Sequence, residues 1–172
     1  MKEAMNEKVW VKSIGPELAN RFGDLNGNGA QVRVDVGKKL PYHCQIQEYD
    51  DGRWIPRVVV ECKIGRISTH DALTYSAKAS THKHVHPYLR YGFLANEREH
   101  YAIPGRLVRH GAYFDFMVTW CATRPKKQEW NAFCELLKQE VQYSRDLQAL
   151  LQTSRSSRRT KYTILHRPLV LR

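Results

Sequence analysis

The stretch RVVVECKIGR, at residues 57–66, joins the most apolar strand of the chain to a glutamate and a lysine that share one face. Three consecutive valines predict a buried β-strand. Successive side chains of a strand point to opposite faces, so Glu61 and Lys63 are expected on the same face. The sequence therefore predicts a carboxylate and an ammonium group held side by side near the end of this strand.

The segments before the valine strand predict its antiparallel neighbours. AQVRVDVG (30–37) alternates apolar and polar residues, and YHCQIQEY (42–49) alternates more weakly. DDGR (50–53) supplies turn residues, so the second and third strands are expected to form a hairpin. A turn at RWIPR (53–57) is the alternative, and it changes which residues lie opposite Glu61.

A capped helix is expected after the valine strand, over STHDALTYSAKASTHK (68–83). Ser68, Thr69 and Asp71 are candidate N-cap residues, because their side-chain oxygens accept hydrogen bonds from the first free backbone amides. Pro87 follows and disfavours further helix.

The rest of the chain predicts two further strands and two further helices. YLRYGFLA (88–95) and YFDFMVTWC (113–121) are typical of strands, and residues 126–153 carry the apolar seam of a long helix. Residues 2–22 also have helical spacing, although the Gly-Pro pair at 15–16 is expected to break or kink that helix. This order indicates an α/β domain with a mixed central β-sheet flanked by helices.

The length of 172 residues suits one domain with a sizeable core. We expect that domain over residues 1–153, with its core at about 31–120, and a basic spacer with a C-terminal strand over residues 154–172. The apolar seam of the long helix has two interpretations, a core contact or a homodimer contact.

The charge balance favours a polyanionic partner. Lysine and arginine number 28 against 17 aspartates and glutamates, which gives a net charge of +11. Neutralising nucleic-acid phosphates releases condensed counterions and drives binding. The N-terminus has no apolar signal core and no run suits a membrane span, so no membrane partner is expected.

The four cysteines lie far apart and form no CxxC pair, which argues against a zinc ribbon. A chain able to build its own core has little need of a disulfide framework. Reduced thiols and a cytoplasmic location are therefore expected.

Glu61 and Lys63 together suit hydrolysis of phosphodiester bonds. A carboxylate binds Mg²⁺, with Mn²⁺ as an alternative, and the metal polarises the phosphate and a water molecule. The lysine positions that water or offsets the charge that builds on phosphorus. The backbone carbonyl of Cys62 is a further candidate ligand. An ordinary ion pair at the end of a sheet is the alternative interpretation.

With the hairpin before it and the helix after it, VVVECK (58–63) resembles the active-site strand of the PD-(D/E)XK nuclease superfamily. The resemblance covers roughly residues 31 to 120. It implies a restriction-endonuclease-like fold, a four-stranded mixed sheet flanked by helices, and Mg²⁺-dependent phosphodiester cleavage. It also implies that Glu61 is a metal ligand and Lys63 the catalytic lysine, commonly in restriction or anti-phage defence.

The superfamily has a second acidic residue earlier in the hairpin, and here the chain departs from the pattern. We expect Asp51 to fill this catalytic and metal-binding role, because it precedes Glu61 by an acceptable spacing. Asp50 and Asp35 are alternatives.

A turn at DDGR would instead place His43, Cys44 and Gln45 opposite Glu61, and none of them is acidic. Substitution of the acid by Gln45 or His43 then remains open. That arrangement indicates a weakened or inactive enzyme.

Basic residues interleaved with tyrosines over residues 87–116 suit a nucleic-acid surface, where guanidinium groups bind phosphate and rings stack on bases. The segment IPGR (103–106) has the form of a loop that enters a groove. The expected phosphate contacts are Lys78, Lys83, Arg90, Arg106 and Arg109.

HKHVHP (82–87) places three histidines at alternate positions. Such spacing allows zinc binding, but no fourth ligand stands nearby. A surface or phosphate-facing cluster is the favoured interpretation of His82, His84 and His86.

Three hypotheses follow for function. The first is an Mg²⁺-dependent DNA endonuclease, with a homodimer placing two sites on a duplex. The second is an inactive nuclease-fold subunit that binds nucleic acid. The third is an RNA-binding protein, supported by charge and tyrosines alone.

Overall fold

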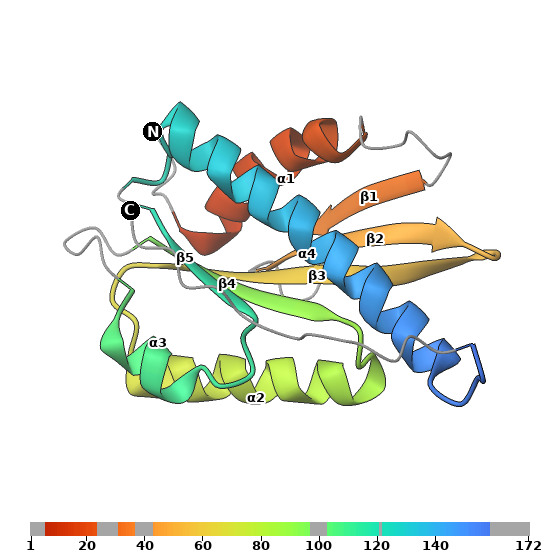
Figure 1. The fold of residues 1–172 in the computed structure, drawn as a ribbon. Coiled ribbons are helices and arrows are strands. Elements are labelled where there is room, and N and C mark those ends of the chain that lie inside the picture. The colour runs from red at the N-terminus through yellow and green to blue at the C-terminus, as the bar shows by residue number, and fades with distance from the viewer. Residues whose placement is uncertain (1–5, 24–30, 37–42, 97–102, 121, 159–172) are drawn as a thin grey trace.

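A mixed, open β-sheet forms the centre of the protein in a computed structural model (Figure 1). The structure describes residues 6–23, 31–36, 43–96, 103–120 and 122–158. Its five strands follow one another in the sheet in chain order: β1 (Gln31–Val36), β2 (His43–Asp50), β3 (Arg53–Ile64), β4 (Arg90–Asn96) and β5 (Phe116–Thr119). The pairs β1–β2 and β2–β3 are antiparallel, whereas the pairs β3–β4 and β4–β5 are parallel.

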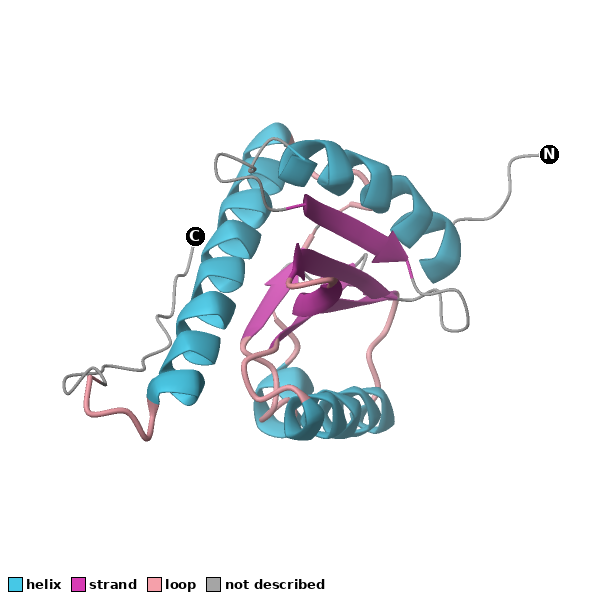
Figure 2. Cartoon of the chain, turned by 90° about the vertical axis from the view of Figure 1, so that its right-hand side faces the viewer, coloured by secondary structure: helices cyan, strands magenta, loops and turns pink. Residues whose placement is uncertain are grey.

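Helices cover both faces of this sheet (Figure 2). One face packs against α1 (Glu7–Gly23) and α4 (Lys127–Thr153), and the other against α2 (Thr69–Val85) and α3 (Gly105–His110). The parallel strands need crossover connections, and α2 and α3 lie in the connections from β3 to β4 and from β4 to β5. The predicted α/β architecture is therefore confirmed.

The valine run of β3 lies between the two cores. Val58 and Val60 pack into the core beneath α1 and α4, and Val59 packs into the core above α2 and α3. A strand buried on both faces needs apolar side chains at every position, which explains the unbroken run of valines.

The hairpin between β2 and β3 turns at Asp51 and Gly52, where both residues have positive φ angles, 47° and 77°. Register pairs Asp50 with Arg53 and His43 with Glu61. The turn is therefore at DDGR, and the alternative turn at RWIPR is wrong.

The start of α2 has the predicted cap. The Asp71 amide donates a 3.0 Å hydrogen bond to Ser68 Oγ, and the Ser68 amide donates a 2.8 Å bond to Asp71 Oδ2. This reciprocal capping box satisfies two amides that a helix start leaves free.

Three expected features, in α1, in IPGR and at the C-terminus, differ from the structure or lie partly outside the described residues. Of the break or kink expected at residues 15–16, the break is absent, because α1 continues through Pro16. IPGR does not form a loop throughout, because α3 begins at Gly105. The predicted C-terminal strand, YTILHRPLVL (162–171), lies outside the described residues, and residues 154–158 of the basic spacer are exposed.

The first part of the apolar seam of α4 belongs to the core. Trp130, Phe133, Leu137 and Val141 are buried against the sheet and α1. This confirms the core interpretation for these residues, whereas Leu151 near the end of the helix is 47 % exposed. None of the described helices is long and apolar enough to span a membrane.

Candidate functional site

Glu61 lies in the middle of the sheet and has no exposure to solvent. Its Oε1 accepts a 2.6 Å hydrogen bond from the Tyr91 hydroxyl and forms an ion pair with the Lys78 ammonium group. Its Oε2 is buried without a hydrogen-bond partner among the described residues. The carboxylate is therefore held inside the protein by β4 and α2.

Two further groups complete the surroundings of this carboxylate. Burial and the charge of Glu61 raise the pKa of Tyr91 strongly, so its hydroxyl remains a hydrogen-bond donor. The His82 ring stands edge-on to Tyr91 at 5.6 Å, and burial with the nearby Lys78 charge lowers the pKa of His82. We call Glu61, Lys78, Tyr91 and His82 the Glu61 cluster.

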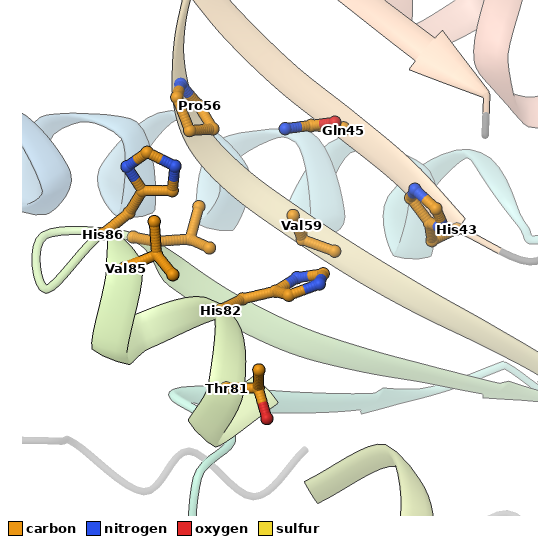
Figure 3. Close-up of a pocket in the computed structure, with 9 residues that line it drawn as sticks. His43, Gln45, Pro56, Val59, Thr81, His82, Val85 and His86 are labelled. Carbon is orange, nitrogen blue, oxygen red and sulfur yellow. The ribbon is translucent and has the colours of Figure 1, made fainter. Parts of the chain in front are cut away.

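A cavity of about 250 Å³ lies beside this cluster, between strands β2 and β3 and the second half of α2. Its lining includes His43 and Gln45 from β2, His82 from α2 and His86 at the C-cap of α2, and Val59 contributes apolar surface (Figure 3). Imidazole and amide groups with apolar walls suit a small polar ligand. None of the described residues that line the cavity is acidic, and Glu61 is not among them.

Lys63 does not share a partner with Glu61. Its ammonium group lies 3.4 Å from Glu7 Oε1 of α1, and about a quarter (25 %) of its side chain is exposed. Lys63 also acts on Asp71 at the start of α2. Although burial opposes the effect, hydrogen bonds from Ser68 and the charge of Lys63 lower the pKa of Asp71. The expected side-by-side pair is therefore separated: Lys63 lies at the sheet edge and Glu61 inside.

The carboxyl ends of β3, β4 and β5 meet at one edge of the sheet, because these strands are parallel. The start of α1 lies there too, since Lys63 reaches Glu7 and the Trp10 indole donates a 2.8 Å bond to the Thr123 carbonyl. Ligands commonly bind at such an edge in α/β sheets. Five exposed basic residues surround it, and we call them the basic edge: Lys8, Arg66, Arg124, Lys126 and Lys127.

Three of the five expected phosphate contacts are internal ion pairs instead. Lys78 binds Glu61, Lys83 lies 2.6 Å from Asp115, and Arg90 lies 3.1 Å from Asp115. Arg90 also donates a 2.5 Å bond to Glu140, and only 7 % of it is exposed. These predictions are wrong, because buried carboxylates already take up the basic groups.

The other two expected contacts lie on α3. Arg106 is half-buried and donates a 2.7 Å bond to the Ile67 carbonyl, which fixes α3 beside the end of β3. Arg109 is exposed. Only Arg109 of the five has a side chain directed mainly to solvent.

Asp51 does not join Glu61. It occupies the hairpin turn, ten strand positions from Glu61, which corresponds to about 33 Å along an extended strand. Asp50 lies at the same turn, and Asp35 pairs with Gln45 on the far side of β2. The prediction of Asp51 as the second acid is wrong, because the turn at DDGR places His43 opposite Glu61.

The residues present do not fit Mg²⁺. This ion needs a set of oxygen ligands, and a lysine ammonium group at the same carboxylate opposes a second cation. Glu61 has one unpaired oxygen, its cross-strand neighbour His43 is an imidazole, and the Cys62 carbonyl has no second carboxylate beside it. Across the described residues, no three histidine, cysteine or acidic side chains form a metal-binding group, and this includes the histidines of HKHVHP.

Sequence reasoning missed two members of the site. Tyr91 stands two positions before Phe93, the parallel-strand partner of Glu61, so the two side chains share a face. Glu7 is an acidic residue in the first turn of α1. The Tyr91 contact depends on the strand register, and the Glu7 contact on where α1 packs against the sheet.

Comparison of the chain with protein-family models, with curated proteins and with solved structures gives no match in any of the three.

Proposed function

We propose that this chain is a nucleic-acid-binding protein with a restriction-endonuclease-like sheet, in which Glu61 stabilises the fold. The observation that carries the proposal is the fully buried Glu61 carboxylate, paired with Lys78 and opposite His43. A metal ligand needs access for the metal and for the phosphate that it polarises. The Oε1 atom of Glu61 is already bound by two protein donors, the Tyr91 hydroxyl and the Lys78 ammonium group.

The basic edge supports nucleic acid as the partner. The acidic groups near it are engaged: Glu7 with Lys63, Asp71 with Ser68, and Glu129 with the Lys126 amide at 2.6 Å. The exposed lysines and arginines there remain available for phosphates. Duplex DNA is the partner we favour, and RNA is the alternative.

The topology supports the nuclease-like scaffold. The PD-(D/E)XK resemblance implies a four-stranded mixed sheet flanked by helices, and the sheet here is mixed and flanked by helices, with five strands. Buried free thiols at Cys44, Cys62 and Cys134 support a reducing, cytoplasmic location.

The second candidate is an Mg²⁺-dependent DNA endonuclease, acting in restriction or anti-phage defence. The unpaired Glu61 Oε2 and the position of Lys63 on the same strand favour it. This function requires Lys78 to leave the carboxylate, so that the metal can replace its charge.

Two measurements test the proposal. Fluorescence anisotropy compares duplex DNA and RNA of equal length, and plasmid cleavage is assayed with Mg²⁺, Mn²⁺ or EDTA. We expect binding without cleavage, and a loss of affinity of about tenfold for Arg66→Glu or Lys127→Glu, because each reverses an edge charge. Arg53→Glu, at the distant hairpin turn, makes the same charge change and is the matched control.

The outcomes separate the candidates. Metal-dependent cutting that disappears in Glu61→Gln and Lys63→Met would establish the endonuclease and reject the first proposal. Equal weakening by Arg66→Glu and Arg53→Glu would remove the basic edge as the interface. Absence of any nucleic-acid binding would reject both the nucleic-acid-binding protein and the endonuclease.

A further inference from the structure

Each charged side chain of helix α2 has a partner within the protein. Asp71 closes the capping box with Ser68, Lys78 pairs with buried Glu61, and Lys83 lies 2.6 Å from Asp115. These three are the only aspartate, glutamate, lysine or arginine residues of α2. The two lysines thus pair with carboxylates of the sheet side of the protein, and the aspartate caps the start of the helix.

The outer face of α2 is correspondingly uncharged. A helix on a protein surface ordinarily presents charged residues to water. Here Leu73 is 51 % exposed and Val85 is 69 % exposed. The exposed side chains of α2 are Thr69, His70, Leu73, Thr74, Ala77, Thr81, His84 and Val85.

Helix α3 and the residues after it extend this surface. The Tyr113 amide donates a 3.3 Å bond to Ser76 Oγ, which places residue 113 beside α2. Val108 is 66 % exposed and Tyr113 is 49 % exposed. We call the outer residues of α2, together with Val108 and Tyr113, the neutral face. Arg109 lies at its rim.

The charge of the chain favours a second copy of the chain as the occupant of the neutral face. Two copies that each carry a net charge of +11 repel one another wherever basic surfaces meet. A surface without formal charge lets them approach, and a two-fold contact pairs it with itself. Nucleic acid or an acidic protein would instead favour the basic edge.

The shape of α2 suits such a contact. Thr74, Ala77 and Thr81 lie at helical spacing along the outer face, and their small side chains permit another helix to pack closely. Leu73 and Val85 stand on the same face and supply apolar surface to bury.

We infer that the chain forms a two-fold homodimer through the neutral face. A 17-residue helix is about 25 Å long, and α3 alongside it gives a face of roughly 500 Å² per copy. Standard interfaces bury about 800 Å² per partner, so this dimer is expected to dissociate at concentrations on the order of micromolar. It forms without nucleic acid and is independent of the proposed function.

Sedimentation equilibrium of the full chain, without nucleic acid, tests the inference. The wild type is expected to change from monomer to dimer as its concentration rises from about 1 to about 200 μM. Ala77→Glu should shift the dissociation constant at least tenfold, because two like charges then meet across the interface. Gln139→Glu, exposed on α4, is the matched control and should leave dimerisation unchanged.

A mixing experiment keeps the test specific. Glutamate and lysine are good helix formers, and Ala77 is exposed, so Ala77→Glu and Ala77→Lys should fold as the wild type does. An equimolar mixture of the Ala77→Glu and Ala77→Lys variants should form dimers again, because the glutamate of one copy then faces the lysine of the other. A wild type that stays monomeric at the highest concentration overturns the inference. So does a dimer that Ala77→Glu weakens no more than Gln139→Glu does.

Discussion

Lys78 and Glu61 form an ion pair inside the protein, although they lie 17 positions apart on a helix and a strand. The carboxylate is fully buried, and about a quarter of the lysine side chain is exposed. The ammonium group therefore neutralises the charge at the position where the resemblance implies a metal.

Removing one member of the pair should cost more stability than removing both. Lys78→Met leaves the Glu61 carboxylate buried without its counter-charge, and we expect a loss of about 3 kcal/mol in the free energy of unfolding. The double variant Glu61→Gln/Lys78→Met should recover most of this loss. Denaturant unfolding measures all three proteins.

The exposed ion pair on α4 provides the control for that cycle. Lys138 lies 2.9 Å from Glu135, and the glutamate side chain is mostly exposed. Lys138→Met should change stability by less than about 0.5 kcal/mol. If Lys78→Met costs no more than Lys138→Met, the buried pair does not stabilise the fold.

Restoring an acid opposite Glu61 should create a cation site. In His43→Asp/Lys78→Gln two carboxylates face each other across the hairpin, and the competing ammonium group is gone. We expect one Mn²⁺ bound per chain by electron paramagnetic resonance and none in the wild type. His43→Asn/Lys78→Gln is the control, since it has the same shape without the second charge. Equal Mn²⁺ binding by both variants would contradict the prediction.

Arg90 should prove structural. Arg90→Met leaves Glu140 without its hydrogen-bonding partner, in a place where burial already raises the pKa of Glu140. We expect a loss of about 3 kcal/mol in unfolding free energy, with nucleic-acid affinity unchanged while the protein is folded. A weakened affinity for nucleic acid at unchanged stability would indicate instead that Arg90 contacts the nucleic acid.

His82 should make stability depend on pH. Burial, followed by the Lys78 charge, holds the pKa of His82 below its ordinary value of 6.5. As the pH falls through that value, the unfolded chain takes up a proton before the folded one does, so the folded state loses stability. Unfolding at pH 7.5 and about 5.5 should therefore show a larger loss for the wild type than for His82→Gln. Equal losses would exclude this contribution.

The sequence was informative where one local rule decides the structure. The valines of β3, the turn at Asp51 and Gly52, and the Ser68 cap each depend on neighbouring residues alone. The buried strand was predicted outright, whereas DDGR was one of two expected turns and Ser68 one of three candidate caps. The short helix α3 was missed because Pro104 and Gly105 are typical of turns as well as of helix starts.

The candidate site was less predictable, because it depends on register and on partners distant in the chain. Asp51 was chosen by spacing, whereas the hairpin turn determines which residue faces Glu61. The roles of Lys78, Lys83 and Arg90 depended on which carboxylates the fold buries beside them. A basic residue on a surface and one in an internal ion pair have the same local sequence signal.

The two halves of α4 are attached to the sheet by different forces. Its first half packs through aromatic and aliphatic side chains, whereas its second half is held by Arg145 on Glu48 and by a 2.6 Å bond from Arg57 to Gln148. Although burial opposes the effect, those arginines lower the pKa of Glu48. Concentrated salt or acid should thus release the end of α4 first, as a separate opening unit. Hydrogen exchange would then show a boundary of protection inside one continuous helix.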